Sequence, residues 1–486
     1  MTFPVLSVAS EMAPLVKTGG LADVTGALPA AVAPHGVAMT TLLPGYPAVL
    51  GALKRARQVY QWDSLLGEPA RLLSAKVAGL PLLALDAPAY FSREGSPYAN
   101  PAGADWQDNW RRFAALGRAA ADVAGGAVKG KRFAVLHAHD WQAAMALAYQ
   151  RFAPLGRKQV AGVMTIHNMA FQGYFDARVF PALALPDRAW SIDGVEFHGG
   201  VSFLKAGLVT ADAITTVSPS YAAEIREAQF GMGLEGVIAS LAERVSGLVN
   251  GIDTAVWNPA TDPDLAVSYS ARTLARRKAN KRALETEFGL EPEEGPLFIA
   301  VSRLTWQKGM DVLADCIDHL VGIGGRLALL GAGEPGIESQ LKAAAARYPG
   351  RFALRLGYDE HLSHRMQGGG DAILVPSRFE PCGLTQLYGL AYGCVPVVAR
   401  TGGLADTVID ANLAALMAGV ATGLQFVGVN RDALAVAISR TVDLYAQPAV
   451  WQNMQRNGMR ADFSWGRSGK AYAQLYKRLT AFEAPA

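Results

Sequence analysis

The chain has 486 residues, of which 51% are hydrophobic and 18% are charged, and its formal net charge is +3. This length exceeds one ordinary hydrophobic core and predicts two domains, and the composition is typical of a compact α/β enzyme rather than of a disordered or fibrous chain. The small net charge and the absence of Lys/Arg blocks argue against nucleic acid as a partner.

The cysteines and the N-terminus indicate the cellular compartment in which we expect the protein. Cys316, Cys382 and Cys394 lack metal-ligand spacing and are too few for a disulfide framework, so we expect a reducing, cytoplasmic location. No apolar run reaches the roughly 18 residues of a membrane span, and no membrane partner is expected. The N-terminus has no basic region and Glu11 interrupts its apolar stretch, which favours a buried strand over a signal peptide.

Short apolar runs alternate with helical patterns along the whole chain. Runs that are apolar on both faces and separated by helices predict parallel sheets of βαβ units. Residues 58–90 alternate more strongly, and we expect a hairpin-like excursion there. The expected strands are 5–9, 38–43, 134–138, 160–166, 213–217 and 248–249 in the first half, and 297–302, 327–330, 352–356, 372–375 and 395–399 in the second.

A turn-rich stretch between Asn250 and Pro263 marks the predicted domain boundary. We expect an N-terminal domain over residues 1–250 and a C-terminal domain over 251–461, which opens with a basic helix at 271–288. The tail from 465 to 482 has apolar residues at helical spacing. We expect the last segment, 462–486, to join the first domain.

The run Thr-Gly-Gly-Leu-Ala-Asp occurs twice, at 18–23 and at 401–406, each time after an apolar run. Paired glycines permit positive φ and a close ligand approach, and the following helix start offers free N–H groups to an anion. The repeat predicts two similar α/β domains facing one cleft. Lys17, directly before the first copy, can neutralise a phosphate there; the alternative is a solvated lysine before a structural turn.

Two charged motifs follow expected strands of the second half. Arg303 and Lys308 lie where ligands bind in open α/β sheets, and they can hold a diphosphate without a metal, although a surface charge pair is the alternative. Glu380 follows the strand at 372–375 and can grip sugar hydroxyls or stabilise a cationic centre, unless it only caps a helix. Cys382 is interpreted as a packed cysteine whose N–H binds ligand rather than as a nucleophile.

Histidines end two strands of the first half. His137 and His139 have the spacing of a metal pair, but no third ligand is evident, so we favour contacts from His167 and Asn168 to sugar hydroxyls or to a leaving group. Asn250 either reaches the cleft or makes a turn. The Asp262-Pro263-Asp264 run is interpreted as a turn and not as a metal site.

Gly331-Ala332-Gly333-Glu334-Pro335-Gly336 matches the dinucleotide-binding pattern, with Asp359 roughly twenty residues further on. Glu334-Pro335 is awkward for a helix start that cradles pyrophosphate. We therefore interpret these glycines as a turn beside the nucleotide, and keep a nicotinamide-dependent oxidoreductase as an alternative.

Together these motifs resemble the bacterial glycogen synthase and plant starch synthase family, over essentially the whole chain. Lys17-Thr18-Gly19-Gly20-Leu21 matches its N-terminal signature, and residues 377–386 match its C-terminal one. The resemblance implies the GT-B fold of two Rossmann-like domains facing a deep cleft. It also implies ADP-glucose as donor, the non-reducing end of an α-1,4-glucan such as glycogen as acceptor, and retention of configuration, with no metal or other cofactor.

The resemblance further implies roles for individual residues. The implied ADP-glucose contacts are Lys17, Gly19, Gly20, Asn168, Asn250, Arg303, Lys308, Tyr358, Glu380, Cys382, Gly383, Leu384 and Thr385. The implied catalytic residues are Glu380, His167, Lys308, Arg303 and Asp140. Many relatives in the wider fold class carry a second Glu eight residues after the first, where this chain has Tyr388, so no ribose-binding carboxylate is assigned. A non-catalytic sugar-nucleotide or glucan-binding protein is a further alternative, and a phosphorylase would need a pyridoxal-binding lysine that we do not find.

Overall fold

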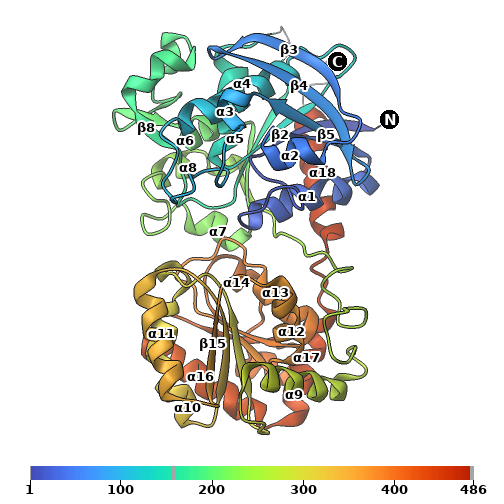
Figure 1. Ribbon diagram of the computed structural model, residues 1–486, viewed down its shortest axis with the longest axis vertical. Helices are drawn as coiled ribbons and strands as arrows, with labels where there is room; N and C mark the ends of the chain where they lie inside the picture. Colours follow the sequence, from blue (N-terminus) through green and yellow to red (C-terminus); the bar gives the residue numbers. More distant parts are fainter. Residues whose placement is uncertain (1, 156–158, 482–486) are drawn as a thin grey trace. The chain divides into compact units, whose positions relative to one another are not determined.

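The computed structural model describes residues 2–155 and 159–481, and the chain divides into two compact units (Figure 1). The first unit contains Met1–Gly251 and Trp465–Ala486, and the second contains Ile252–Ser464. The chain therefore leaves the first unit once and returns to it at its last helix. Across the described residues, no helix has both the length and the apolar character that a membrane crossing requires.

A nine-stranded sheet forms the centre of the first unit, in the order β12-β11-β7-β6-β1-β2-β5-β4-β3. The strands from β12 to β5 are parallel to their neighbours, and β4 and β3 extend the β5 edge as antiparallel strands. The strands are β1 Phe3–Val8, β2 Val37–Pro44, β3 Arg57–Leu65, β4 Glu68–Val77, β5 Leu80–Asp86, β6 Val135–His139, β7 Ala161–Ile166, β11 Ala213–Thr216 and β12 Val245–Gly247. A small antiparallel sheet joins β8 Tyr174–Asp176, β10 Gly200–Ser202 and β9 Glu196–Phe197.

Helices cover both faces of this sheet. The core on one face includes buried residues of α4 Asn109–Ala124, α5 Asp140–Phe152 and α6 Phe203–Thr210. On the other face, Tyr472 and Tyr476 of α18 Trp465–Ala481 pack with Leu28 of α1 Gly20–Val32. The amphipathic tail expected from the sequence is therefore a helix that completes the first unit. The shorter helices are α2 Pro47–Ala52, α3 Pro88–Phe91, α7 Pro219–Glu224 and α8 Glu235–Ser240.

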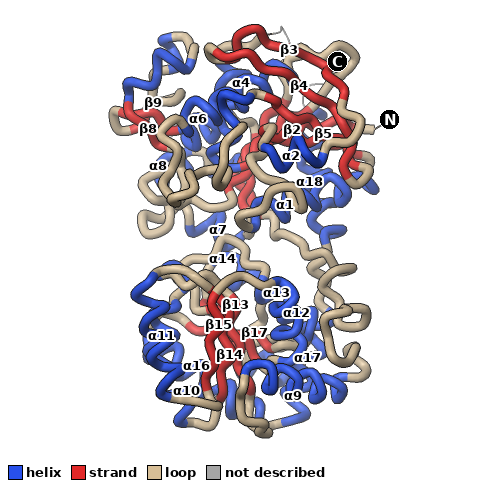
Figure 2. The backbone as a smooth tube through the Cα atoms, in the orientation of Figure 1, coloured by secondary structure: helices blue, strands red, loops and turns tan. Residues whose placement is uncertain are grey.

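The second unit has a six-stranded parallel sheet in the order β15-β14-β13-β16-β17-β18. Figure 2 shows helices on both sides of its strands. The strands are β13 Leu297–Val301, β14 Arg326–Gly331, β15 Phe352–Leu356, β16 Ala372–Val375, β17 Val395–Ala399 and β18 Leu424–Phe426. The helices are α9 Arg277–Phe288, α10 Met310–Gly322, α11 Pro335–Arg347, α12 Glu360–Gly369, α13 Thr385–Tyr392, α14 Gly402–Thr407, α15 Leu413–Met417, α16 Arg431–Tyr445 and α17 Pro448–Arg460.

Most strands lie where the apolar runs predict them, and the α/β class is confirmed, but three expectations need correction. The strand expected at 248–249 is β12 at Val245–Gly247, whose serine and glycine hide it from an apolar search. The excursion at 58–90 contains the expected hairpin of β3 and β4, but β5 also returns to pair in parallel with β2. The three-residue strand β18 has no counterpart in the sequence prediction.

The strand order of each unit changes direction at its first strand. In the first unit β1 has β2 on one side and β6 on the other, and in the second unit β13 has β14 on one side and β16 on the other. In open α/β sheets ligands bind outside the carboxyl ends of the strands at such a switch point. The residues after β1, β6, β13 and β16 are therefore the first place to look for a site.

Candidate active site

Lys308 and Glu380, which the sequence places after expected strands, lie together at the carboxyl ends of β13 and β16. The Lys308 ammonium forms an ion pair with Glu380 Oε2, and Ser377 Oγ donates a hydrogen bond of 2.9 Å to the same oxygen. Glu380 is only 7% exposed. A small pocket beside the pair is lined by the residues Val301, Ser302, Lys308, Met310, Leu374, Val375, Ser377, Glu380 and Thr385.

Two features lock the loops that carry this pair. Gly309 has φ +66, and a Cβ there would lie 1.9 Å from the carbonyl oxygen of Pro376, so only glycine lets the loops touch. Arg378 forms two hydrogen bonds of 2.7 Å to the Asp311 carboxylate and donates at 2.6 Å to the Trp306 carbonyl. Sequence reasoning missed the roles of Asp311 and Ser377, because their partners, Arg378 and Glu380, are brought next to them only by the fold.

Arg303 and Tyr358 lie outside this contact cluster. The Arg303 guanidinium is exposed and donates at 3.3 Å to Gln307 Oε1. Tyr358 is 79% exposed, and its hydroxyl donates at 2.6 Å to Glu360. Both side chains are open to solvent, so their implied phosphate and adenine contacts stay predictions.

The segment from Cys382 to Thr385 leads into α13. Cys382 is buried, which fits its interpretation as a packed cysteine. Gly383 has φ +71, and the Gln386 side-chain amide donates at 3.0 Å to both the Cys382 and the Gly383 carbonyls. Gln386 therefore holds the turn that presents Leu384 and Thr385 at the start of the helix.

The second Thr-Gly-Gly copy has the expected positive φ, at Gly402 (+43), but lies in crowded surroundings. Gly402 and Gly403 are buried, and a Cβ on them would lie 2.1 Å from the carbonyl oxygens of Glu380 and Cys382, respectively. The Gly403 N–H donates to the Glu380 carbonyl at 3.1 Å. The chain's own backbone occupies the space beside this diglycine, which therefore supports the loop that carries Glu380; a ligand contact there stays a prediction.

The first copy is exposed. Neither Gly19 nor Gly20 would place a Cβ within 4 Å of another atom, and Gly20 begins α1. The expected positive φ is absent: Gly19 has φ −165, which is extended backbone. Lys17 pairs with Asp23 at 2.8 Å. The buried carboxylate of Glu11 accepts hydrogen bonds from the Thr18 N–H and, at 2.7 Å, from its hydroxyl, a role that sequence reasoning did not find.

His167, Asp140 and Asn168 come together at the ends of β6 and β7. Asp140 has φ +55, a strained value for a non-glycine residue, and its Oδ1 accepts the His167 N–H at 2.7 Å. Burial raises the pKa of Asp140 to about 7 and lowers the pKa of His167 to about 3. Asn168 Oδ1 accepts the Ala170 N–H at 3.0 Å.

Asn250 lies near the end of the first unit. It is buried, and its side-chain oxygen has no hydrogen-bond partner among the described residues. Leaving a buried amide oxygen without a hydrogen-bond partner costs free energy, so a ligand or a water molecule that donates to this oxygen would be favoured.

The His-x-His pair does not form a metal group within the described chain. His137 bonds at 2.8 Å to the Tyr476 hydroxyl and at 2.6 Å to Thr165 Oγ1, and His139 bonds to Ser7 and His167. Among the described residues, a metal-like grouping is found instead at Asp262, Asp264 and His364.

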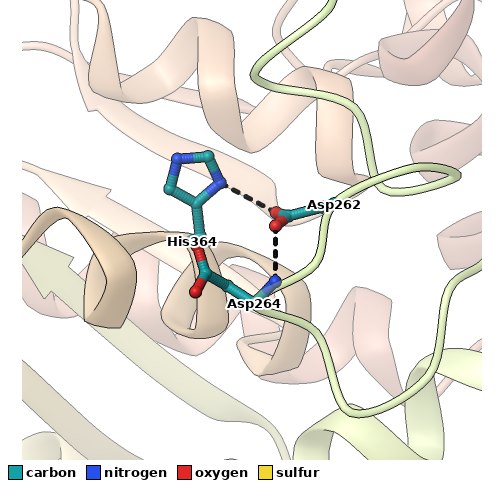
Figure 3. Close-up of side chains that lie close together, drawn as sticks. All are labelled: Asp262, Asp264 and His364. Carbon is teal, nitrogen blue, oxygen red and sulfur yellow. Dashed lines mark hydrogen bonds and ion pairs between the residues drawn. The ribbon is translucent and has the colours of Figure 1, made fainter.

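Figure 3 shows that these three residues form hydrogen bonds with one another. His364 Nδ1 lies 2.8 Å from Asp262 Oδ2, and the Asp264 N–H donates at 2.9 Å to Asp262 Oδ1, as in a turn. The Trp257 ring stacks on the ring of His364, with ring centroids 3.8 Å apart, and on the ring of Tyr388, with ring centroids 3.6 Å apart. Tyr388, eight residues after Glu380, therefore packs against the segment that enters the second unit.

The dinucleotide-like glycines also serve packing. A Cβ on Gly331 would lie 2.0 Å from the Ser302 carbonyl oxygen, and one on Gly333 would lie 2.3 Å from that of Leu304. The Gly333 N–H donates to Glu338 at 3.0 Å. Asp359 caps α12 by accepting the Leu362 N–H at 2.8 Å. The pattern is explained by contacts within the unit, which removes the basis of the oxidoreductase alternative.

Comparison with known proteins assigns both units. Residues 4–240 match the family described as starch synthase catalytic domain, and residues 282–458 match glycosyl transferases group 1. The chain is 71% identical over 482 residues to a glycogen synthase of Novosphingobium aromaticivorans, with 99% of each chain covered. It is 58% identical over 477 residues to a glycogen synthase of Mesorhizobium japonicum, with 98% of each covered.

Solved structures agree with these relatives. The catalytic domain of starch synthase IV from Arabidopsis thaliana, bound to ADP and acarbose, is 31% identical, with a TM-score of 0.87 over 99% of this chain and 100% of that one. A sucrose-phosphate synthase from Thermosynechococcus elongatus, 17% identical with a TM-score of 0.60 over 99% of this chain and 100% of that one, shares the fold. This chain belongs to the glycogen synthase and starch synthase family, and it is a glycosyltransferase of the GT-B type.

Proposed function

We propose that this enzyme transfers glucose from ADP-glucose to the non-reducing end of an α-1,4-glucan, releases ADP and retains the α configuration. The observation that carries the proposal is 71% identity, over 99% of both chains, to a glycogen synthase. The starch synthase IV structure, which holds ADP and acarbose, supports an adenine nucleotide and a saccharide as ligands.

The pair at the switch point of the second unit suits the chemistry of the donor. Breaking the bond between glucose and phosphate builds positive charge on the sugar and negative charge on the leaving ADP. Lys308 and the exposed Arg303 supply positive charge for the diphosphate, and the Glu380 carboxylate suits sugar hydroxyls. Thr385 lines the same pocket. The Cys382 and Gly383 amides lie on the loop between Glu380 and Thr385, and Tyr358 offers an exposed ring for adenine.

The first unit contributes a helix start and a group of buried polar side chains. The exposed N-terminus of α1, with Gly19, Gly20 and Lys17, suits a phosphate oxygen, because a helix start carries free N–H groups and partial positive charge. His167, Asn168, Asp140 and Asn250 suit sugar hydroxyls. Fixed cations and amides can stabilise the leaving group, so we propose that no metal or other cofactor is needed.

The test is transfer of labelled glucose to glycogen from ADP-glucose and from UDP-glucose, each with and without a chelator. We expect incorporation from ADP-glucose, much less from UDP-glucose, and no effect of the chelator. NMR of the product should show an α-1,4 linkage. Binding of ADP-glucose without chain growth would instead indicate a non-catalytic binding protein, and loss of activity with the chelator would refute the metal-free mechanism.

A further inference from the structure

Three buried side chains from neighbouring strands form a line of hydrogen bonds that ends at His167. Ser7 lies on β1, His139 ends β6 and His167 follows β7. His139 Nε2 is 3.2 Å from Ser7 Oγ, and His139 Nδ1 is 3.1 Å from His167 Nε2. His139 and Ser7 are at most 1% exposed, and His167 is 9% exposed. The line therefore runs from the interior of the sheet to its carboxyl edge.

Both imidazole rings are neutral near pH 7. Burial lowers the pKa of His167 to about 3 and the pKa of His139 well below its usual value. A neutral imidazole donates from one nitrogen and accepts at the other. One proton therefore lies between His139 and His167, and either His139 Nδ1 or His167 Nε2 carries it.

Ser7 decides between these two arrangements. Its hydroxyl is buried, and among the described residues its one side-chain hydrogen bond is to His139 Nε2. If His139 Nε2 carried a proton, the Ser7 hydroxyl oxygen would have to accept the hydrogen bond from that nitrogen. The hydroxyl proton of Ser7 would then have no acceptor, at a cost of about 1–3 kcal/mol. The arrangement without that cost has Ser7 donating to His139 Nε2, and His139 Nδ1 donating to His167 Nε2.

We propose that His139 is a positioning residue that, with Ser7, holds His167 as the tautomer protonated at Nδ1. No described residue forms a hydrogen bond with His167 Nδ1, while its backbone N–H is fixed by Asp140 at 2.7 Å. His167 thus presents a donor, in a fixed orientation, to an acceptor oxygen. That this oxygen belongs to the substrate rests on the proposed function, whereas the tautomer does not.

The direct test is ¹⁵N NMR of the full chain labelled at its eight histidines. The His167 signals, assigned from a His167→Gln variant, should show a protonated Nδ1 and an unprotonated Nε2. Ser7→Ala removes the donor to His139 and should allow the opposite tautomer to appear. Tyr476→Phe is the matched control, because it deletes a buried hydroxyl that bonds to His137 at 2.8 Å and not to this line; its His167 signals should not change.

Kinetics test the consequence for turnover. His139→Leu removes the donor to His167 and should lower kcat about 10- to 100-fold with little change in KM, as expected for a lost orienting partner. His139→Asn places an amide N–H near the position of Nδ1 and should recover most of that loss. A variant that fails to fold leaves the wild-type spectrum as the deciding measurement.

The outcomes separate the two proposals. A wild-type His167 protonated at Nε2, or His139→Asn no better than a folded His139→Leu, would overturn the positioning role even in an active enzyme. The expected tautomer in a protein that transfers no glucose would instead count against the proposed function alone.

Discussion

The two copies of Thr-Gly-Gly-Leu-Ala-Asp have one sequence and two opposite surroundings. At Gly19 and Gly20 an added Cβ would meet no atom within 4 Å, and residues 17–20 are exposed. At Gly402 and Gly403 the same atom would lie 2.1 Å from a backbone carbonyl oxygen, and both glycines are buried. The first copy thus leaves room for a ligand, whereas the second leaves room for the loop that carries Glu380.

The difference arises from what each copy packs against. Glu11 holds Thr18 of the first copy from one side, and α1 continues for 13 residues with its start exposed. In the second copy α14 is only six residues long, and its Gly403 N–H is used by the Glu380 carbonyl. A repeated motif therefore indicates a repeated strand–turn–helix, and its neighbours decide whether it binds a ligand or supports a site.

The largest combined effect, on stability and turnover together, is expected from Gly403→Ala. The new Cβ would lie 2.1 Å from the Cys382 carbonyl oxygen and 2.4 Å from its Cα, so the loop bearing Glu380 must move. We expect a loss of about 3 kcal/mol in the free energy of unfolding and a fall of more than about 100-fold in turnover. Denaturant unfolding and glucose transfer measure the two effects.

Gly336→Ala is the matched control for this substitution, because Gly336 lies in the first turn of α11 and a Cβ there would meet nothing within 4 Å. It should leave turnover nearly unchanged and should stabilise the protein by no more than about 1 kcal/mol. If Gly403→Ala behaves like Gly336→Ala, the second copy does not support the Glu380 loop.

Features that depend on local sequence patterns could be predicted, whereas features that depend on contacts between distant segments could not. Apolar runs locate nearly all of the central strands, because strands of parallel sheets are buried on both faces. The positions of Lys308 and Glu380 after buried strands are predictable, whereas their ion pair is not, because it depends on β13 and β16 being neighbours in the sheet. The support from Glu11, Ser377 and Asp311 could not be predicted, because it depends on contacts that the fold alone creates.

Tyr388 illustrates the same limit. The sequence shows only that a carboxylate found in many relatives is absent, whereas the structure shows Trp257 stacked on the tyrosine ring at 3.6 Å. The left-handed conformation expected for the first diglycine was wrong for a related reason. An extended Gly19 reaches the helix start without it.

The first unit also contains a buried acid, Asp140, whose protonation is coupled to stability. Burial, with a further contribution from the Glu11 charge, raises the pKa of Asp140 from 3.8 to about 7. The folded state therefore binds a proton that the unfolded state has lost between these values. Stability from this group is complete below pH 3.8 and is lost as the pH rises through 7, by about 4 kcal/mol in all.

Asp140→Asn should abolish this dependence and keep the fold, because asparagine tolerates φ +55 and its oxygen can still accept the His167 N–H. The measurement is the difference in unfolding free energy between wild type and variant from pH 4 to 8, which should decline up to about pH 7 and then level off. A constant difference across this range would show that Asp140 is ionised throughout in the folded protein.

The function of the supported loop is tested by Glu380→Gln. The amide keeps the size of the side chain and can accept from Ser377, but it leaves the Lys308 charge unpaired. We expect turnover to fall about 100- to 1,000-fold, the range for loss of one stabilising group at a reacting centre. Ser377→Ala removes one hydrogen bond and keeps the ion pair, so it should cost less. Equal losses in both variants would mean that the charge of Glu380 is not what matters.

A smaller effect is expected from Lys17→Ala beside the exposed copy. Lys17 and Asp23 are a partly exposed pair, with side chains 37% and 27% exposed, so stability should change by less than about 1 kcal/mol. Loss of a charge-assisted bond to phosphate should raise the KM for ADP-glucose about 10- to 100-fold. Lys17→Arg should retain most of the affinity, and Lys54→Ala, at another exposed lysine of the first unit, should have no effect. An unchanged KM would leave Lys17 as a solvated residue before a turn.

A small change in stability of the opposite sign is expected from Gly20→Ala, the counterpart of Gly403→Ala in the exposed copy. Gly20 is the first residue of α1 and has open space around it, so alanine should stabilise the protein by up to about 1 kcal/mol through its helix propensity. Its Cβ would nevertheless stand where a phosphate must approach the helix amides, and the KM for ADP-glucose should rise. Unfolding and donor kinetics on one sample separate the two effects. Unaltered kinetics would mean that no ligand occupies the space beside Gly20. A destabilised protein would mean that other protein atoms occupy this space in solution, as they do beside Gly403.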